Sequence, residues 1–190
     1  THDKGVILDG TGTVSFACTN TFIQGVTLNS GVLIANAPEN PGVSGPLAIT
    51  GPITFNGGTL RYSATNNVDY SARFNCGGLY NIDTAGRNVT FATALSSGSL
   101  TKIGNGALTL SGANTYNGDT IVGGGSLVTT TASTGAGNYT VTNGSTLDVQ
   151  VGAVGAQLTM NTLTLGGGPA DVSTLQIDTL ATGNPTAAPV

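Results

Sequence analysis

The sequence predicts an all-β protein, a solenoid of about 8 stacked coils, on three observations. Glycine contributes 30 of the 190 residues and charged residues only 7%, so Thr, Ser, Asn and Gly must cover the surface, and these are poor helix formers. Apolar residues make up 38% of the chain and recur in strand-length runs between Gly and Asn. One strand–turn–strand unit also recurs along the chain.

The repeated unit is a strand that ends at Asn or Gly, a turn of small residues, and a second strand that contains a leucine. Asn and Gly accept positive φ at low cost, which suits such a turn. The anchoring leucines lie 27, 67 and 20 residues apart, and 67 is close to three units of about 22. They are Leu33, Leu60, Leu127 and Leu147. A period of this length is typical of a solenoid.

The alternative fold is a β-sandwich, because Asn-Gly between two strands is also a hairpin signal. The fixed offset between the turn and the following leucine favours the solenoid. We expect the core to contain the leucines of the repeated units and the apolar residues that alternate with polar ones in the same strands. These are Leu28, Leu33, Phe55, Leu60, Leu108, Leu110, Leu127, Leu147, Leu163 and Leu165.

We expect a single solenoid domain over residues 1–190, with three parts that stand out. An irregular surface loop is expected at residues 36–46, where two prolines flank Glu39-Asn40. Residues 62–80 look like an insertion, because they hold several of the aromatic residues and two Asp-to-Arg spacings begin in or near them. We expect the pairs Asp69/Arg73 and Asp83/Arg87 to lie in exposed turns. The clearest repeat occupies residues 100–130.

Residues 100–120 read LTKIGNGALTLSGANTYNGDT, and Gly125-Ser126-Leu127 follow. This segment resembles the autotransporter-associated β-strand repeat, whose pattern is L-T-K-x-G-x-G-x-L-x-L-S-G-x-N-x-Y-x-G followed by a short strand and G-x-L. The resemblance implies a right-handed parallel β-helix in a secreted or surface-displayed bacterial protein. In that family the repeat aids export and folding or serves as a stalk.

Composition argues against several classes of function. The net charge is −4 and the five basic residues are scattered, so we expect no nucleic-acid partner. No apolar run reaches the length of about 18 residues that a membrane span needs. Neither end carries a recognisable cap or anchor, which we interpret as a chain cut from a longer one or left open for a neighbour.

Catalytic groups are also scarce. His2 is the only histidine and lies in an N-terminal segment that we expect to fray. None of the nine acidic residues is paired at i+2, the spacing that puts two carboxylates on one face of a strand. We therefore expect no enzyme, no catalytic residue, no cofactor and no metal site, with a polysaccharide-degrading β-helix as the remote alternative.

Cys18 and Cys76 are the two cysteines of the chain. In an exported protein they would be oxidised, and we predict a disulfide between them. A bond closing a loop of this length would stabilise the fold by about 4 kcal/mol in the chain-entropy model. The alternative is a pair of buried free thiols.

The predicted function is structural: a secreted or cell-surface stalk or filament subunit that assembles end to end with copies of itself. The strand-like segments Gly5–Leu8 and Leu175–Leu180 leave unprotected edges at opposite ends, and a contact between unlike ends builds open polymers. The alternative is an adhesin module that binds glycan or a cell surface through Tyr62, Tyr70 and Tyr80. We favour the other interpretation of these tyrosines, in which they pack the insertion against the solenoid.

Overall fold

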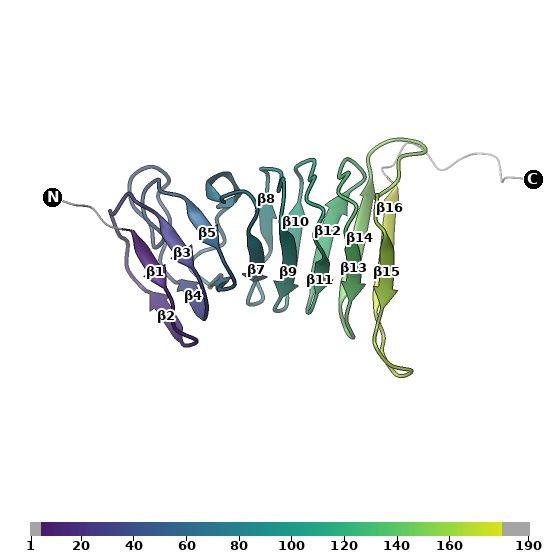
Figure 1. The fold of residues 1–190 in the computed structure, drawn as a ribbon, viewed down its shortest axis with the longest axis horizontal. Coiled ribbons are helices and arrows are strands. Elements are labelled where there is room, and N and C mark those ends of the chain that lie inside the picture. The colour runs from purple at the N-terminus through teal and green to yellow at the C-terminus, as the bar shows by residue number, and fades with distance from the viewer. Residues whose placement is uncertain (1–4, 180–190) are drawn as a thin grey trace, which may run out of the picture.

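The computed structural model describes residues 5–179 and confirms an all-β parallel solenoid. Its strands run across the long axis and are stacked side by side from the N-terminal to the C-terminal end (Figure 1). All paired strands are parallel and belong to three sheets, here the N-terminal, central and C-terminal sheets. The N-terminal sheet contains β1 (Val6–Leu8), β3 (Val26–Leu28) and β5 (Ile53–Phe55).

The central sheet has eight strands, and each of them marks one coil of the solenoid, numbered 1 to 8 from the N-terminal end. These strands are β2 (Thr13–Phe16), β4 (Val32–Ala35), β6 (Thr59–Arg61), β7 (Leu79–Asp83), β9 (Ser99–Ile103), β11 (Thr120–Val122), β13 (Asn138–Val141) and β15 (Thr162–Leu165). The C-terminal sheet contains β8 (Val89–Phe91), β10 (Ala107–Leu110), β12 (Ser126–Thr130), β14 (Thr146–Val151) and β16 (Thr174–Thr179).

The second strand of a coil changes its place between coils 3 and 4. In coils 1 to 3, a strand of the N-terminal sheet precedes the central strand; in coils 4 to 8, a strand of the C-terminal sheet follows it. Leu60 of β6 therefore pairs with Ile82 of β7. In its own coil β6 is the strand after the corner turn, whereas β7 is the strand before the corner turn of the next coil. The repeated leucines consequently lie in two sheets: Leu33 and Leu60 in the central sheet, Leu127 and Leu147 in the C-terminal one.

Residues 62–78 join the two halves and cover the sheet edges that this exchange leaves. The Asp69 carboxylate accepts a hydrogen bond from the Ala92 amide at 2.8 Å, and the Ser71 hydroxyl accepts one from Thr93 at 3.0 Å, next to the first strand of the C-terminal sheet. The Asn75 amide donates to the carbonyl oxygen of Ile53, in the last strand of the N-terminal sheet, at 3.0 Å. The segment also contains a short 3-10 helix, η1 (Ser71–Arg73).

Inward-facing side chains form continuous columns between the sheets, as the register Leu108–Leu127–Leu147 shows. Eight of the ten predicted core residues are buried. Leu163 is partly buried and Leu165 is 46% exposed, although both face inward, because no described coil covers coil 8.

Glycine is required where a corner turn meets the turn of the preceding coil. Gly125 has a φ of +61°, and a Cβ at that position would overlap the carbonyl oxygen of Gly106 in the coil before it. Gly31, with a φ of +71°, meets Gly10 in the same way. The Gly/Asn turns predicted from the sequence are thus the corners of the solenoid, and their close stacking excludes larger residues.

Candidate functional site: a side lobe on the N-terminal coils

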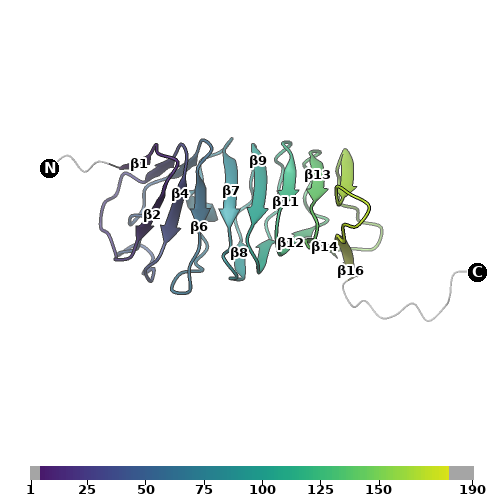
Figure 2. The same ribbon diagram turned by 90° about the horizontal axis from the view of Figure 1, so that it is seen from below.

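Three connections, residues 17–25, 36–52 and 62–78, follow the central strands of coils 1, 2 and 3, and we refer to them together as the side lobe. The connections in coils 2 and 3 have 17 residues each, against 7 to 10 in coils 4 to 7. They lie at the purple-to-blue end of the chain (Figures 1 and 2). Long connections held by a rigid scaffold are where binding residues most often occur, so the side lobe is the candidate functional site.

A buried hydrogen-bond network joins the second connection of the lobe to the third. The Tyr70 hydroxyl donates to the Glu39 carboxylate at 2.7 Å. Asn66 donates through its side-chain amide to the Tyr70 oxygen at 2.7 Å and to the Ala37 carbonyl at 2.9 Å. The first connection is attached by Asn20, which donates to the carbonyl oxygen of Pro46 at 3.0 Å.

Arg73 fastens the same two connections through its guanidinium group. It donates to the backbone carbonyl oxygens of Gly51 at 2.9 Å and Ala48 at 3.2 Å, and also to Leu47. The guanidinium lies over the ring of Tyr70, 5.8 Å from its centre. A planar fork of donors suits such a set of carbonyl groups. The side chain of Arg73 thus fixes the backbone of the turn at residues 47–51 by hydrogen bonds. Of the pair Asp69/Arg73, expected in an exposed turn, Asp69 is exposed, whereas Arg73 is a half-buried anchor.

The pKa values of two residues of the network are raised from those of free side chains. Burial raises the pKa of Glu39, while the hydrogen bond from Tyr70 and the nearby Arg73 charge act in the opposite direction. Burial, together with the Glu39 contact, also raises the pKa of Tyr70 far above its usual value. Tyr70 therefore stays protonated and remains the donor in its bond to Glu39.

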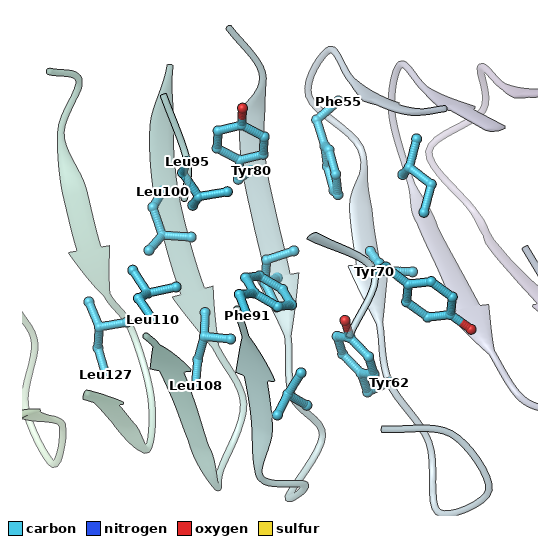
Figure 3. Packing of buried hydrophobic residues seen from close by; sticks show 14 of the residues in the cluster. Phe55, Tyr62, Tyr70, Tyr80, Phe91, Leu95, Leu100, Leu108, Leu110 and Leu127 are labelled. Carbon is cyan, nitrogen blue, oxygen red and sulfur yellow. The ribbon is translucent and has the colours of Figure 1, made fainter. Parts of the chain in front are cut away.

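Tyr62, Tyr70 and Tyr80 are in the core, at 1%, 2% and 1% exposure. Figure 3 shows their rings lying among the buried leucines and phenylalanines. Tyr62 and Tyr70 stack on each other, with ring centres 6.2 Å apart, and Tyr80 packs on Phe74 at 5.9 Å. A ring buried to this extent cannot stack on a sugar, so the burial of the three rings argues against the alternative in which they face a glycan and agrees with the packing that we favoured.

The side lobe exposes few large apolar groups. Val43, in the loop at residues 40–44, is 58% exposed. Around it lie polar groups and backbone, including the half-buried Glu39 and the exposed Asn40. The lobe thus presents a small, mostly polar surface on a rigid support.

The predicted disulfide between Cys18 and Cys76 is not formed: both are exposed free thiols. Cys18 follows β2 and Cys76 precedes β7, and these strands are three positions apart in the central sheet, about 14 Å at the usual strand spacing. They also lie at opposite ends of parallel strands. A disulfide needs Cα atoms within about 7 Å, so the fold separates the two residues.

The described residues form no cluster of metal-ligating side chains. Over residues 5–179, no group of three or more His, Cys, Asp and Glu side chains could hold a metal ion. His2 lies outside the described residues. No helix in that same range is long and apolar enough to span a membrane. One salt bridge joins described residues, between Arg61 and Asp83 at 3.3 Å. Of the pair Asp83/Arg87, which we expected in an exposed turn, Arg87 is exposed.

The repeat at residues 100–130 forms coil 5 and part of coil 6, and its lysine is inside the solenoid. Lys102 is fully buried. Its ammonium group donates to the carbonyl oxygens of Gly104 at 2.6 Å and Gly124 at 2.8 Å, and to the Thr84 hydroxyl at 3.0 Å. Burial lowers its pKa to about 8, against a smaller opposite effect of Asp83. Composition gave no reason to single out this residue; its fixed place in the repeat pattern was the available signal.

Comparisons with known proteins place part of the sequence beside autotransporter passengers. The family model described as the passenger-associated-transport-repeat matches residues 100–128. The adhesin BmaC autotransporter of Brucella suis biovar 1 (strain 1330) is 34% identical over 128 residues, which cover 63% of this chain and 4% of that protein. No solved structure matches the chain significantly. Residues 100–128 therefore match the passenger-associated-transport-repeat, and the chain resembles an autotransporter adhesin of which it spans only a small part.

Proposed function

We propose that this chain is a structural segment of a surface-displayed or secreted bacterial adhesin, in which the solenoid is a stiff stalk that carries the side lobe. The observation that carries the proposal is the continuous parallel stack of eight coils with the passenger repeat in its middle. The similar protein bears the name of an adhesin, which supports a surface role for this chain. The proposed function includes no catalysis.

The stalk is tested by measuring how far it holds an epitope from a membrane. Eight coils at about 4.8 Å per coil should add roughly 40 Å. The chain is inserted between an outer-membrane anchor and a fluorescent epitope, and energy transfer to a membrane dye is compared with a fusion that lacks residues 79–179. The proposal expects weaker transfer from the full insertion. Equal transfer from both fusions would contradict a stalk.

A binding role for the side lobe is the second candidate, because its three connections are fixed together and face solvent. A glycan or cell-surface partner would contact the loop at residues 40–44 and not the buried tyrosines. Binding of the purified chain to a glycan array and to epithelial cells is compared between Val43→Glu and Val154→Glu, a control near the other end, where Val154 is 94% exposed. If Val43→Glu alone loses binding, the result supports adhesion through the side lobe. If both variants bind equally, the result contradicts it.

End-to-end self-assembly is the remaining proposal for how the stalk grows. β2 and β15 are the edge strands of the same sheet, so a second copy could add through them. The other strand of each end coil belongs to a different sheet: β1 of coil 1 is in the N-terminal sheet, and β16 of coil 8 is in the C-terminal sheet. Sedimentation over a range of concentrations tests this contact: polymers that Leu165→Lys abolishes support it, and a monomer at high concentration overturns it.

A further inference from the structure

Two buried polar side chains of the repeat, Lys102 and Asn114, each connect the same three coils. Lys102 belongs to β9 in coil 5, and its ammonium group contacts Thr84 in coil 4, Gly104 in coil 5 and Gly124 in coil 6. These contacts lie at the corner turns between the central and C-terminal sheets. The register Ile82–Lys102–Val122 shows that the neighbours of Lys102 in the inward column are apolar.

Asn114 does the same in the connection that follows β10. Its side-chain oxygen accepts a hydrogen bond from the Leu95 amide of coil 4 at 2.9 Å. Its side-chain nitrogen donates to Gly112 of coil 5 at 2.8 Å and to the Ser133 hydroxyl of coil 6 at 3.1 Å. Asn114 is 2% exposed, so these bonds are shielded from water.

Both residues are costly choices for a core. Lysine is almost never fully buried unless its charge is satisfied, and an apolar side chain would complete the column. The two residues add hydrogen bonds that reach the coils on both sides of their own. In a solenoid each coil normally contacts only the next, so the stack can open from either end. A side chain that hydrogen-bonds to three successive coils, to the backbone of two and to a buried hydroxyl of the third, makes those coils open together.

We propose that Lys102 and Asn114 form a three-coil lock, which makes coils 4 to 6 one cooperative unit and the last part of the solenoid to open. The lock acts at two separate places on the coil, the corner turns and the connections after the C-terminal strands. Coils on either side also have side-chain hydrogen bonds between them, but there the asparagines that bond to both neighbouring coils, Asn29 and Asn138, are half-buried and exposed respectively and so remain open to water.

Hydrogen–deuterium exchange of the whole chain, read by mass spectrometry, tests the lock. Amides of coils 4 to 6 should exchange more slowly than those of coils 1, 2 and 8. Lys102→Met should speed exchange at least tenfold at residues 84–88, 103–106 and 123–125. Asn114→Ala should do so at residues 92–98, 111–119 and 131–137. The matched controls are Ile82→Met, which changes the neighbouring position of the same column, and Asn117→Ala, which removes an exposed asparagine of the same connection.

The result that overturns the lock is exchange in Lys102→Met and Asn114→Ala no faster than in their controls. Thr84→Val gives a second route if Lys102→Met does not fold. It removes the hydroxyl that accepts from Lys102 and donates to the Asn105 carbonyl at 2.6 Å. Faster exchange confined to the corners of coils 4 and 5 supports the lock, and exchange that rises evenly along the chain contradicts it.

Discussion

The Tyr70 hydroxyl lies 2.7 Å from the Glu39 carboxylate, 31 positions apart in the sequence, and this bond joins two connections of the side lobe. Removing it by Tyr70→Phe leaves Glu39 half-buried without its donor. We expect a loss of about 1–2 kcal/mol in the free energy of unfolding and faster proteolysis at residues 40–44. Chemical denaturation and limited proteolysis measure the two effects.

Tyr62→Phe is the matched control, because the Tyr62 hydroxyl is buried without a hydrogen-bond partner. Its ring stacks on that of Tyr70, so both substitutions remove one oxygen from the same aromatic pair. We expect Tyr62→Phe to be neutral or slightly stabilising. Equal destabilisation by the two variants would show that the Tyr70 bond does not hold the lobe.

The buried lysine predicts an unusual dependence of stability on pH. The pKa of Lys102 is about 8 in the folded chain and near 10.4 in an unfolded one. Between these values the unfolded chain holds a proton that the folded chain has released, so the free energy of unfolding rises with pH, by at most about 1.4 kcal/mol per pH unit. Below about pH 7 the residue contributes no slope.

Urea denaturation between about pH 7 and pH 9.5 measures this rise, below the range in which tyrosines of the unfolded chain ionise. Lys102→Met should abolish the rise, whereas Ile82→Met should keep it. A flat profile in the unaltered protein would mean that Lys102 keeps its ordinary pKa.

Local patterns predicted the strands and corners well, since alternation and Gly/Asn turns are properties of a few neighbouring residues. The unit around Leu33 and the unit around Leu127 were aligned correctly as strand–turn–strand segments. Their second strands nevertheless lie in different sheets. Which strand pairs with which depends on residues 62–78, whose edge-covering hydrogen bonds have no sequence signature.

The side-chain roles were harder to predict for the same reason. Tyr62 and Tyr80 carry no mark that distinguishes a packing ring from a binding ring; the sheet exchange decides that they lie inside. The distance between Cys18 and Cys76 depends on the number of coils between them. Lys102 was part of a recognised pattern, but only the stacked corners reveal the carbonyl groups that it binds.

Inward columns predict where apolar side chains matter. Leu108 is fully buried between Val89 and Leu127 of the neighbouring coils, so Leu108→Ala should cost about 2–5 kcal/mol of unfolding free energy. Leu165→Ala, in the half-exposed end of its column, should cost less than about 1 kcal/mol. Thermal or chemical denaturation of both variants checks the difference, and similar losses would contradict the assigned register.

The separated cysteines predict two reactive thiols. Cys18 and Cys76 are exposed, so a thiol reagent should modify both in the folded protein without denaturant, and Cys18→Ser should not alter the reactivity of Cys76. Mass spectrometry counts the modified sites. A disulfide between Cys18 and Cys76 would contradict the fold, in which the strands next to them, β2 and β7, are three positions apart in the central sheet.

The most direct test of the eight-coil solenoid is a set of distances along one outward column of the central sheet. Thr13, Thr59, Thr101 and Thr164 lie in one register, in coils 1, 3, 5 and 8. Spin labels are placed on pairs that share position 164, in a chain with both native cysteines changed to serine, and the separations are measured by pulsed electron resonance. The solenoid predicts backbone separations of about 14, 24 and 34 Å for partners at 101, 59 and 13, at about 4.8 Å per coil. Separations that do not grow in proportion to the number of coils, as in two packed antiparallel sheets, would contradict it.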